Sequence, residues 1–259
     1  MSNELHHRSK GDGAPTLVLL HAGVADARMW GPLVENLASD HTVIWCDMRG
    51  FGRTPSTPEP FEHGEDVTAV VRSHTDGSVW LVGASLGSRV AVDLALGGDL
   101  DVAGLVLVPP TISGMAFDDD VSSSWDLVDE RLEAGDVDGA VAEEVRVWVV
   151  GEDRTEAEVE PEVLALAREM IRTNSGHVDH DSEERRARKA YGALEEVDVP
   201  VLVMVGRHDR HEVRALAAEV AERCPDAALH VFDDAAHLVA LERPDVVGDL
   251  VRRHVTPTG

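Results

Sequence analysis

One stretch decides the fold: Val79-Trp80-Leu81-Val82-Gly83-Ala84-Ser85-Leu86-Gly87. Its apolar half predicts a buried strand, and the Gly-x-Ser-x-Gly that closes it predicts a sharp turn into a helix. That helix is indicated by apolar residues at helical spacing after the turn: Val90, Ala91, Leu94 and Ala95. The two glycines let strand and helix approach closely enough to expose the Ser85 hydroxyl beside the positive end of the helix. The pattern therefore predicts a nucleophilic serine at position 85.

Short apolar runs of the same kind recur on both sides of this motif. They predict strands at 16–20, 42–46, 79–82, 105–108, 201–205 and 229–232. Helical periods separate several of them: Trp30, Leu33, Val34 and Leu37; Val67, Val70, Val71 and His74; Val213, Leu216, Ala217 and Val220. This alternation predicts an α/β fold, with a mostly parallel central sheet and helices on both faces. Before Thr16 there is room for one antiparallel strand, around residues 5–8.

The alternation stops between residues 111 and 198. This stretch shows no convincing strand, but it has helical patterns at 121–133, 137–150, 161–172 and 183–195. We interpret it as a helical cap inserted into the sheet. The predicted domains are therefore a catalytic domain of residues 1–110 and 199–259 and a cap of residues 111–198.

A serine hydroxyl needs an imidazole to take its proton and a carboxylate to orient that imidazole. Asp209 stands just past the predicted strand 201–205, and His237 just past the strand 229–232. We therefore predict His237 as the general base and Asp209 as its orienting acid. Asp233 and Asp234 lie on the approach to His237 and are interpreted as loop acids.

Composition excludes several classes of protein. The chain has 259 residues, 43% of them hydrophobic, which suits one large core. Its 49 acidic and 23 basic residues give a net charge of −26, which repels nucleic acids and anionic membranes. The polar first fifteen residues and the short apolar run after them do not make a signal or membrane span, so a cytoplasmic protein is expected. Cys46 and Cys224 are too few for a disulfide framework and are expected to be buried.

Two histidines flank the predicted acid. His208 and His211 resemble metal ligands, but no set of carboxylates and histidines at zinc-site spacing completes them in the sequence. We therefore expect no metal and no other cofactor. His21 ends the first long strand and is expected to shape a loop.

Five motifs carry a resemblance to a known family. They are His21-Ala22-Gly23, the segments 47–54 (Asp-Met-Arg-Gly-Phe-Gly-Arg-Thr) and 83–87, Gly206-Arg207-His208-Asp209, and the segment 237–244 (His-Leu-Val-Ala-Leu-Glu-Arg-Pro). Through them the sequence resembles the α/β-hydrolase superfamily over nearly its whole length. Within that superfamily it is similar to the group of small esterases, 3-oxoadipate enol-lactonases and cofactor-free haloperoxidases.

The resemblance implies further roles. The backbone NH groups of Gly23 and Leu86 would form the oxyanion hole, with Val24 as the neighbouring alternative because Ala22 stands where the family usually has glycine. The segment 47–54 would be a structural turn without chemistry. Family members with an aspartate nucleophile act on carbon–halogen bonds or epoxides. Because this chain has Ser85 at that position, neither activity is expected. The resemblance also leads us to expect that the first edge strand of the family is missing here.

The predicted cap also suggests a substrate. Leu164, Ala167 and Ile171 form one apolar stripe, and Val141, Val145 and Trp148 form another. Such stripes predict an apolar inner face over Ser85, and hence a small neutral or modestly polar ester or lactone. The candidate substrate-binding residues are Met29, Trp30, Trp125, Trp148 and Met170. Arg146 or Arg172 would hold a single carboxylate if the substrate carried one.

Two alternatives to the hydrolase stay open. The same triad can use peroxide in place of water, as in the cofactor-free haloperoxidases. The chain can also be a ligand receptor on this fold with negligible turnover. A small-molecule partner is expected in each case, and the chain is expected to be a monomer or a homodimer.

Overall fold

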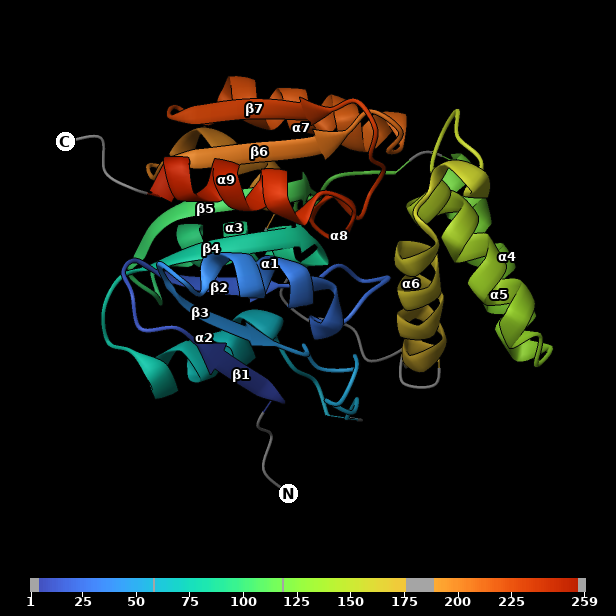
Figure 1. Cartoon of the computed structure of the whole chain (residues 1–259), viewed down its shortest axis with the longest axis horizontal. Coiled ribbons are helices and arrows are strands. Elements are labelled where there is room, and N and C mark those ends of the chain that lie inside the picture. The colour runs from blue at the N-terminus through green and yellow to red at the C-terminus, as the bar shows by residue number, and fades with distance from the viewer. Residues whose placement is uncertain (1–4, 58, 118, 176–188, 256–259) are drawn as a thin grey trace.

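The computed structural model describes residues 5–57, 59–117, 119–175 and 189–255, and it is built on a sheet of seven strands (Figure 1). The strand order is β1-β3-β2-β4-β5-β6-β7. β1 runs antiparallel to its neighbour and all other pairs are parallel. The strands are β1 (His7–Lys10), β2 (Thr16–Leu20), β3 (Thr42–Cys46), β4 (Val79–Ser85), β5 (Val102–Pro110), β6 (Val201–Gly206) and β7 (Ala227–Phe232).

Helices cover both faces of the sheet because successive strand residues point to opposite sides. On β2, Leu17 and Leu19 pack into one core with α1 (Gly31–Leu37), α8 (Val239–Glu242) and α9 (Pro244–Val255). Val18 and Leu20 pack into the other core with α2 (His63–His74), α3 (Leu86–Gly97) and α7 (His211–Arg223). In Figure 1, α1 and α9 lie in front of the sheet. The predicted fold class is confirmed.

Between β5 and β6 the chain forms helices and turns. They are α4 (Asp119–Glu133), α5 (Val137–Glu144), the π-helical turn η2 (Val145–Val150), the 3₁₀ turn η3 (Glu156–Glu158), α6 (Pro161–Asn174) and the 3₁₀ turn η4 (Ala190–Glu196). α4, α5 and α6 stand beyond the carboxyl ends of the strands (Figure 1). The helix predicted over 183–195 lies partly outside the described residues, and its described part is the 3₁₀ turn η4.

Several element bounds differ from those predicted. β5 begins at Val102 and β7 at Ala227, earlier than their apolar runs indicate. In β7, Ala227 and Ala228 pair with Val201 and Leu202 of β6, so the neighbouring strand holds residues of low strand propensity in the sheet. β1 begins at His7, two residues later than the expected strand at 5–8. Its pairing with β3 sets its register. No helix within the described ranges is long and apolar enough to cross a membrane.

Candidate active site

Ser85 lies at the point where β4 ends and α3 begins. Its backbone has φ 50° and ψ −111°, a conformation that costs a non-glycine residue about 1–3 kcal/mol. Both motif glycines are needed for this turn. A Cβ on Gly83 would lie 2.4 Å from the carbonyl oxygen of Gly87, and one on Gly87 would lie 2.0 Å from that of Leu20. The turn therefore has the strained, glycine-flanked geometry that exposes a nucleophile at the end of a strand.

His237 and Asp209 form a buried pair behind this turn. Asp209 follows β6 and His237 follows β7, and their exposed fractions are 0% and 1%. The Nδ1 atom of His237 lies 2.9 Å from both carboxylate oxygens of Asp209, and the backbone NH of Arg210 donates to Oδ1 over 2.8 Å. Because the carboxylate accepts the Nδ1 proton, Nε2 is left as the acceptor of the imidazole.

The two acids just before His237 lie outside this pair. Asp233 makes an ion pair with Arg207, and Asp234 makes one of 2.8 Å with Arg243. Both carboxylates are exposed, and the Arg243 guanidinium lowers the pKa of Asp234. The structure thus puts Asp209, and neither loop acid, against the imidazole.

Ser85 and His237 line one cavity of about 640 Å³. A volume of this size accommodates a small organic ligand. Gly23 and Leu86 line the same cavity, as does Val24. The sequence motifs that lie more than 150 residues apart are therefore gathered at the carboxyl ends of the strands, where open α/β sheets bind ligands.

An aromatic wall faces the imidazole. The Trp148 ring lies 4.6 Å from the His237 ring, centroid to centroid. Trp125 stacks on Trp148 at 6.4 Å, and Phe117 meets Trp125 edge-on at 5.0 Å. All three aromatic residues line the cavity. Two of the predicted substrate-binding residues, Trp125 and Trp148, are therefore at the cavity surface.

The position of Trp148 depends on a π-helical turn. The sequence predicts a regular helix over 137–150, but the α-helix ends at Glu144 and the chain continues as η2. A π turn holds one more residue per turn than an α-helix and is frequent at functional sites. The apolar period of the sequence gave no sign of this turn.

The other three substrate-binding candidates are in the core, which corrects the sequence prediction. Met29, Trp30 and Met170 are fully buried and do not line the cavity. The thioether of Met29 accepts the backbone NH of Ala22 at 3.5 Å, so it supports the loop from beneath. Large apolar residues near a site pack the core as readily as they contact ligand, and sequence cannot separate the two.

The arginines considered for a substrate carboxylate are also elsewhere. Arg146 pairs with Glu143 over 2.7 Å, and Arg172 pairs with Asp138 over 2.6 Å. Both guanidinium groups are exposed and neither residue lines the cavity. The cationic side chain among the lining residues is Arg89, one turn into α3, and the sequence analysis did not single it out.

Asn174 is a site residue that sequence reasoning missed. Its Nδ2 donates to the carbonyl oxygen of Ala25 at 2.9 Å, and its Oδ1 accepts the backbone NH of Gly52 at 3.1 Å. The side chain is buried at the end of α6 and borders the cavity. It therefore ties the helical segment to the loop that carries Gly23 and to the turn after β3.

A buried ion pair holds the loop that carries His237. Arg154 Nη1 lies 2.7 Å from Glu242 Oε2, and both side chains are 3% exposed. Glu242 Oε1 accepts the backbone NH of Ala236 at 2.8 Å, next to His237. Arg154 also donates to the carbonyl oxygens of Val149 and Val150 in η2. The partners are 88 residues apart, so no local pattern indicates the pair.

The turn at 47–54 is held by its own first residue. Asp47 accepts the backbone NH of Ala27 at 2.8 Å and that of Arg53 at 3.1 Å. Buried His21 joins this turn to β2, because its Nε2 accepts the backbone NH of Met48 at 2.9 Å. Burial lowers the pKa of His21, which keeps that nitrogen an acceptor. Phe51 at the tip also lines the cavity, a contact that the sequence analysis did not expect.

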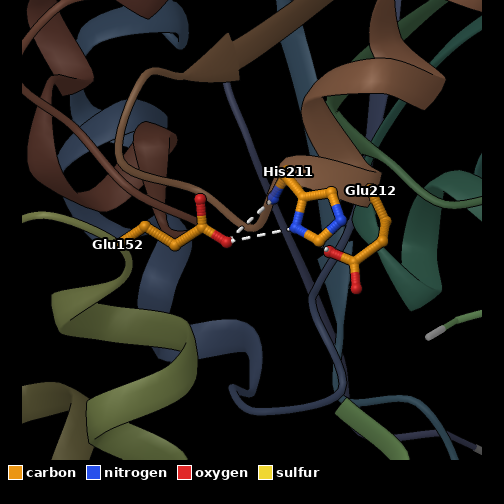
Figure 2. Close-up of side chains that lie close together, drawn as sticks. All are labelled: Glu152, His211 and Glu212. Atoms are coloured by element: carbon orange, nitrogen blue, oxygen red, sulfur yellow. Dashed lines mark hydrogen bonds and ion pairs between the residues drawn. The ribbon is translucent and has the colours of Figure 1, made fainter. Parts of the chain in front are cut away.

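Three side chains that carry potential metal-ligand atoms lie together beside the Asp209 loop (Figure 2). Ligand atoms of Glu152, His211 and Glu212 come within 4.8 Å of one another, a set the sequence analysis did not find because Glu152 is distant in the chain. Its carboxylates are already compensated by cations. Glu152 pairs with Arg214 at 2.7 Å, and Arg210 lies 3.7 Å from both carboxylates. The arrangement fits an ionic tether between the loop after η2 and the start of α7.

Known proteins that are similar to this chain share its architecture. A model described as "Alpha/beta hydrolase family" matches residues 17–250. A pimeloyl-[acyl-carrier protein] methyl ester esterase from Vibrio parahaemolyticus is 37% identical over 112 residues, which is 42% of this chain and 41% of that protein. An esterase of the same name from Pectobacterium atrosepticum is 24% identical over 249 residues, covering 95% of this chain and 96% of that one. The solved enol-lactonase from Burkholderia xenovorans LB400 has a TM-score of 0.80 at 23% identity, covering 98% of this chain and 96% of the other.

Proposed function

The chain belongs to the alpha/beta hydrolase family, and from that premise we propose that it is a serine hydrolase of small carboxylic esters or lactones. Ser85 is the nucleophile, His237 the general base and Asp209 the acid that orients it. The relatives named as esterases support ester bonds as the class of substrate. The observation that carries the proposal is the His237–Asp209 pair, at 2.9 Å, behind a cavity that His237 and Ser85 both line.

The reaction proceeds in two halves. His237 Nε2 takes the Ser85 proton as Oγ attacks the carbonyl carbon, and Asp209 stabilises the imidazolium that forms. The backbone NH groups of Gly23 and Leu86 receive the oxyanion, each contributing about 3 kcal/mol in the transition state. His237 then protonates the leaving alcohol, or the ring oxygen of a lactone. In the second half it activates water, which releases the acid from Ser85.

The proposal also assigns the parts of the chain. Residues 1–110 and 199–259 form the catalytic domain, and residues 111–198 form a cap that brings Trp125 and Trp148 to the cavity. The triad needs no metal or organic cofactor. A cytoplasmic location, and a monomer or homodimer, stay as predictions from the sequence.

The test is a screen of p-nitrophenyl esters and small lactones, with wild type and Ser85→Ala in parallel. A fluorophosphonate probe should label wild type and leave Ser85→Ala unlabelled. Ser88→Ala is the matched control, because its buried hydroxyl donates to two backbone carbonyls and does not line the cavity. Labelling of Ser85→Ala, or turnover by that variant at the wild-type rate, would overturn the assignment. Peroxide-dependent halogenation without ester turnover would favour the perhydrolase alternative, and binding without any turnover the receptor.

A further inference from the structure

The wall of the cavity that faces Ser85 is acidic as well as aromatic. Asp126 and Asp129 line it from α4, and Glu144 lines it from the last turn of α5. Arg89 is the cationic side chain among the lining residues, and it comes from the α3 side, together with Ser85. Three carboxylates and three aromatic rings thus meet on the part of the cavity that the helical segment contributes.

Glu144 is the most informative of these carboxylates. It lies one helical turn before Trp148, whose indole NH donates a hydrogen bond to it, and Trp148 in turn packs on His237. Burial, with the nearby charges of Glu143 and Asp129, raises the pKa of Glu144 to about 7. This carboxylate, which lines the same cavity as His237, is therefore costly to ionise in the free protein. A cation placed next to it would remove that cost.

We infer that the cavity selects an ester carrying an organic ammonium group, held between Glu144 and the rings of Trp148 and Trp125 with Asp126 and Asp129 on the rim. The inference rests on the proposed function, because the group is placed relative to the Ser85 and His237 of an ester-cleaving site. Aromatic faces and carboxylates both attract ammonium ions, and more strongly in a site shielded from water. The net charge of −26 adds a long-range attraction of the same sign.

Three esters of butyric acid test this recognition. Choline butyrate carries a permanent cation, 3,3-dimethylbutyl butyrate is its neutral isostere, and 3-sulfopropyl butyrate is anionic. For wild type at pH 8 and low ionic strength, kcat/KM should be about tenfold or more higher for the choline ester than for the isostere. Glu144→Gln should lose most of this ratio. Glu130→Gln is the matched control, since it removes one exposed charge on α4 outside the cavity, and it should keep the ratio.

The ratio should also depend on pH. Between pH 6 and 8 Glu144 loses its proton, so the preference for the choline ester should rise across this range in wild type and stay flat in Glu144→Gln. The other titratable or charged groups that line the cavity are Asp126, Asp129, Arg89 and His237, and Glu143 precedes Glu144 on its helix. Dividing one ester's rate by the other's cancels the titration of His237, which both reactions require.

Binding to Ser85→Ala separates this inference from the proposed function. Calorimetric titration of that variant with the choline ester and its isostere measures recognition without turnover, and adding Glu144→Gln to it should remove most of the difference in affinity. Absence of Ser85-dependent hydrolysis of the p-nitrophenyl esters, the lactones and all three butyrates would overturn the proposed function. The inference would be overturned if rates and affinities for the choline ester and its isostere agreed within twofold, or if the sulfopropyl ester were preferred. Neither result would contradict the proposed hydrolase function.

Discussion

The sheet and the helical segment between β5 and β6 contribute to the same cavity in different ways. Ser85, Asp209 and His237 stand at the ends of parallel strands, and the hydrogen bonds of the sheet fix their spacing. The helical segment reaches the cavity through side chains such as Trp148 and Asn174, whose positions depend on contacts across the interface. The comparison teaches that the sheet fixes the spacing of the predicted triad, whereas the helical segment decides which side chains a substrate would meet.

The largest effect should come from the sheet side. Asp209→Asn should lower kcat by about 10⁴, because an amide disturbs the imidazole tautomer while leaving its shape almost unchanged. The melting temperature should stay close to wild type, whereas labelling of Ser85 by a fluorophosphonate should slow, because it needs the same proton transfer to His237. Asp234→Asn is the control, because its exposed pair with Arg243 is worth at most about 1 kcal/mol. A rate collapse in Asp234→Asn with normal turnover in Asp209→Asn would reverse the assignment.

The same division explains what the sequence could predict. Continuous apolar runs predicted the six parallel strands, and the strand ends then pointed to Ser85, Asp209 and His237. The family resemblance is confirmed by the match over residues 17–250. Two of the residues that were missed, Asn174 and Arg154, have side-chain partners more than 80 residues away. Burial of Met29 and Trp30 was not predictable either, because an apolar side chain has the same sequence signal in a core and in a pocket.

The next test addresses the interface itself. Arg154→Met leaves Glu242 buried without its cation, and this should lower the free energy of unfolding by about 3–5 kcal/mol. Turnover should fall as well, since Glu242 holds the backbone beside His237. The double variant Arg154→Met/Glu242→Met should regain most of the stability. Chemical denaturation measures both, with Arg168→Met as the control for an exposed pair with Glu156. If Arg154→Met were as stable as wild type, the buried ion pair would not stabilise the fold.

A smaller effect is expected at Asn174. Asn174→Ala removes two hydrogen bonds and leaves the carbonyl of Ala25 and the NH of Gly52 without this partner. Stability should fall by about 1–3 kcal/mol. Because the freed loop carries Gly23, kcat/KM for short p-nitrophenyl esters should fall about tenfold, close to the loss of part of one oxyanion interaction. Thr173→Ala changes the neighbouring residue on α6, whose hydroxyl contacts exposed Arg28, and should leave kcat/KM unchanged. Equal rates in both variants would mean that the sheet alone shapes the oxyanion loop.

The smallest effect should come from a single indole NH. Trp148→Phe keeps an aromatic ring against His237 and removes the hydrogen bond to Glu144. That bond favours the charged carboxylate, so its loss should raise the pKa of Glu144 above about 7. One hydrogen bond of this kind corresponds to at most about one pH unit.

The pH midpoint at which the cationic ester becomes preferred over its isostere should therefore move upward by up to that amount, while the rate on the isostere stays within a few fold. Trp125→Phe is the control for the midpoint alone, because it changes a second ring of the proposed ammonium site without removing the hydrogen bond from Trp148. In that variant the size of the preference should fall and its pH midpoint should stay where it is in wild type. An unmoved midpoint in Trp148→Phe would show that Glu144 does not set the preference, and the helical segment would then act on the substrate through shape alone.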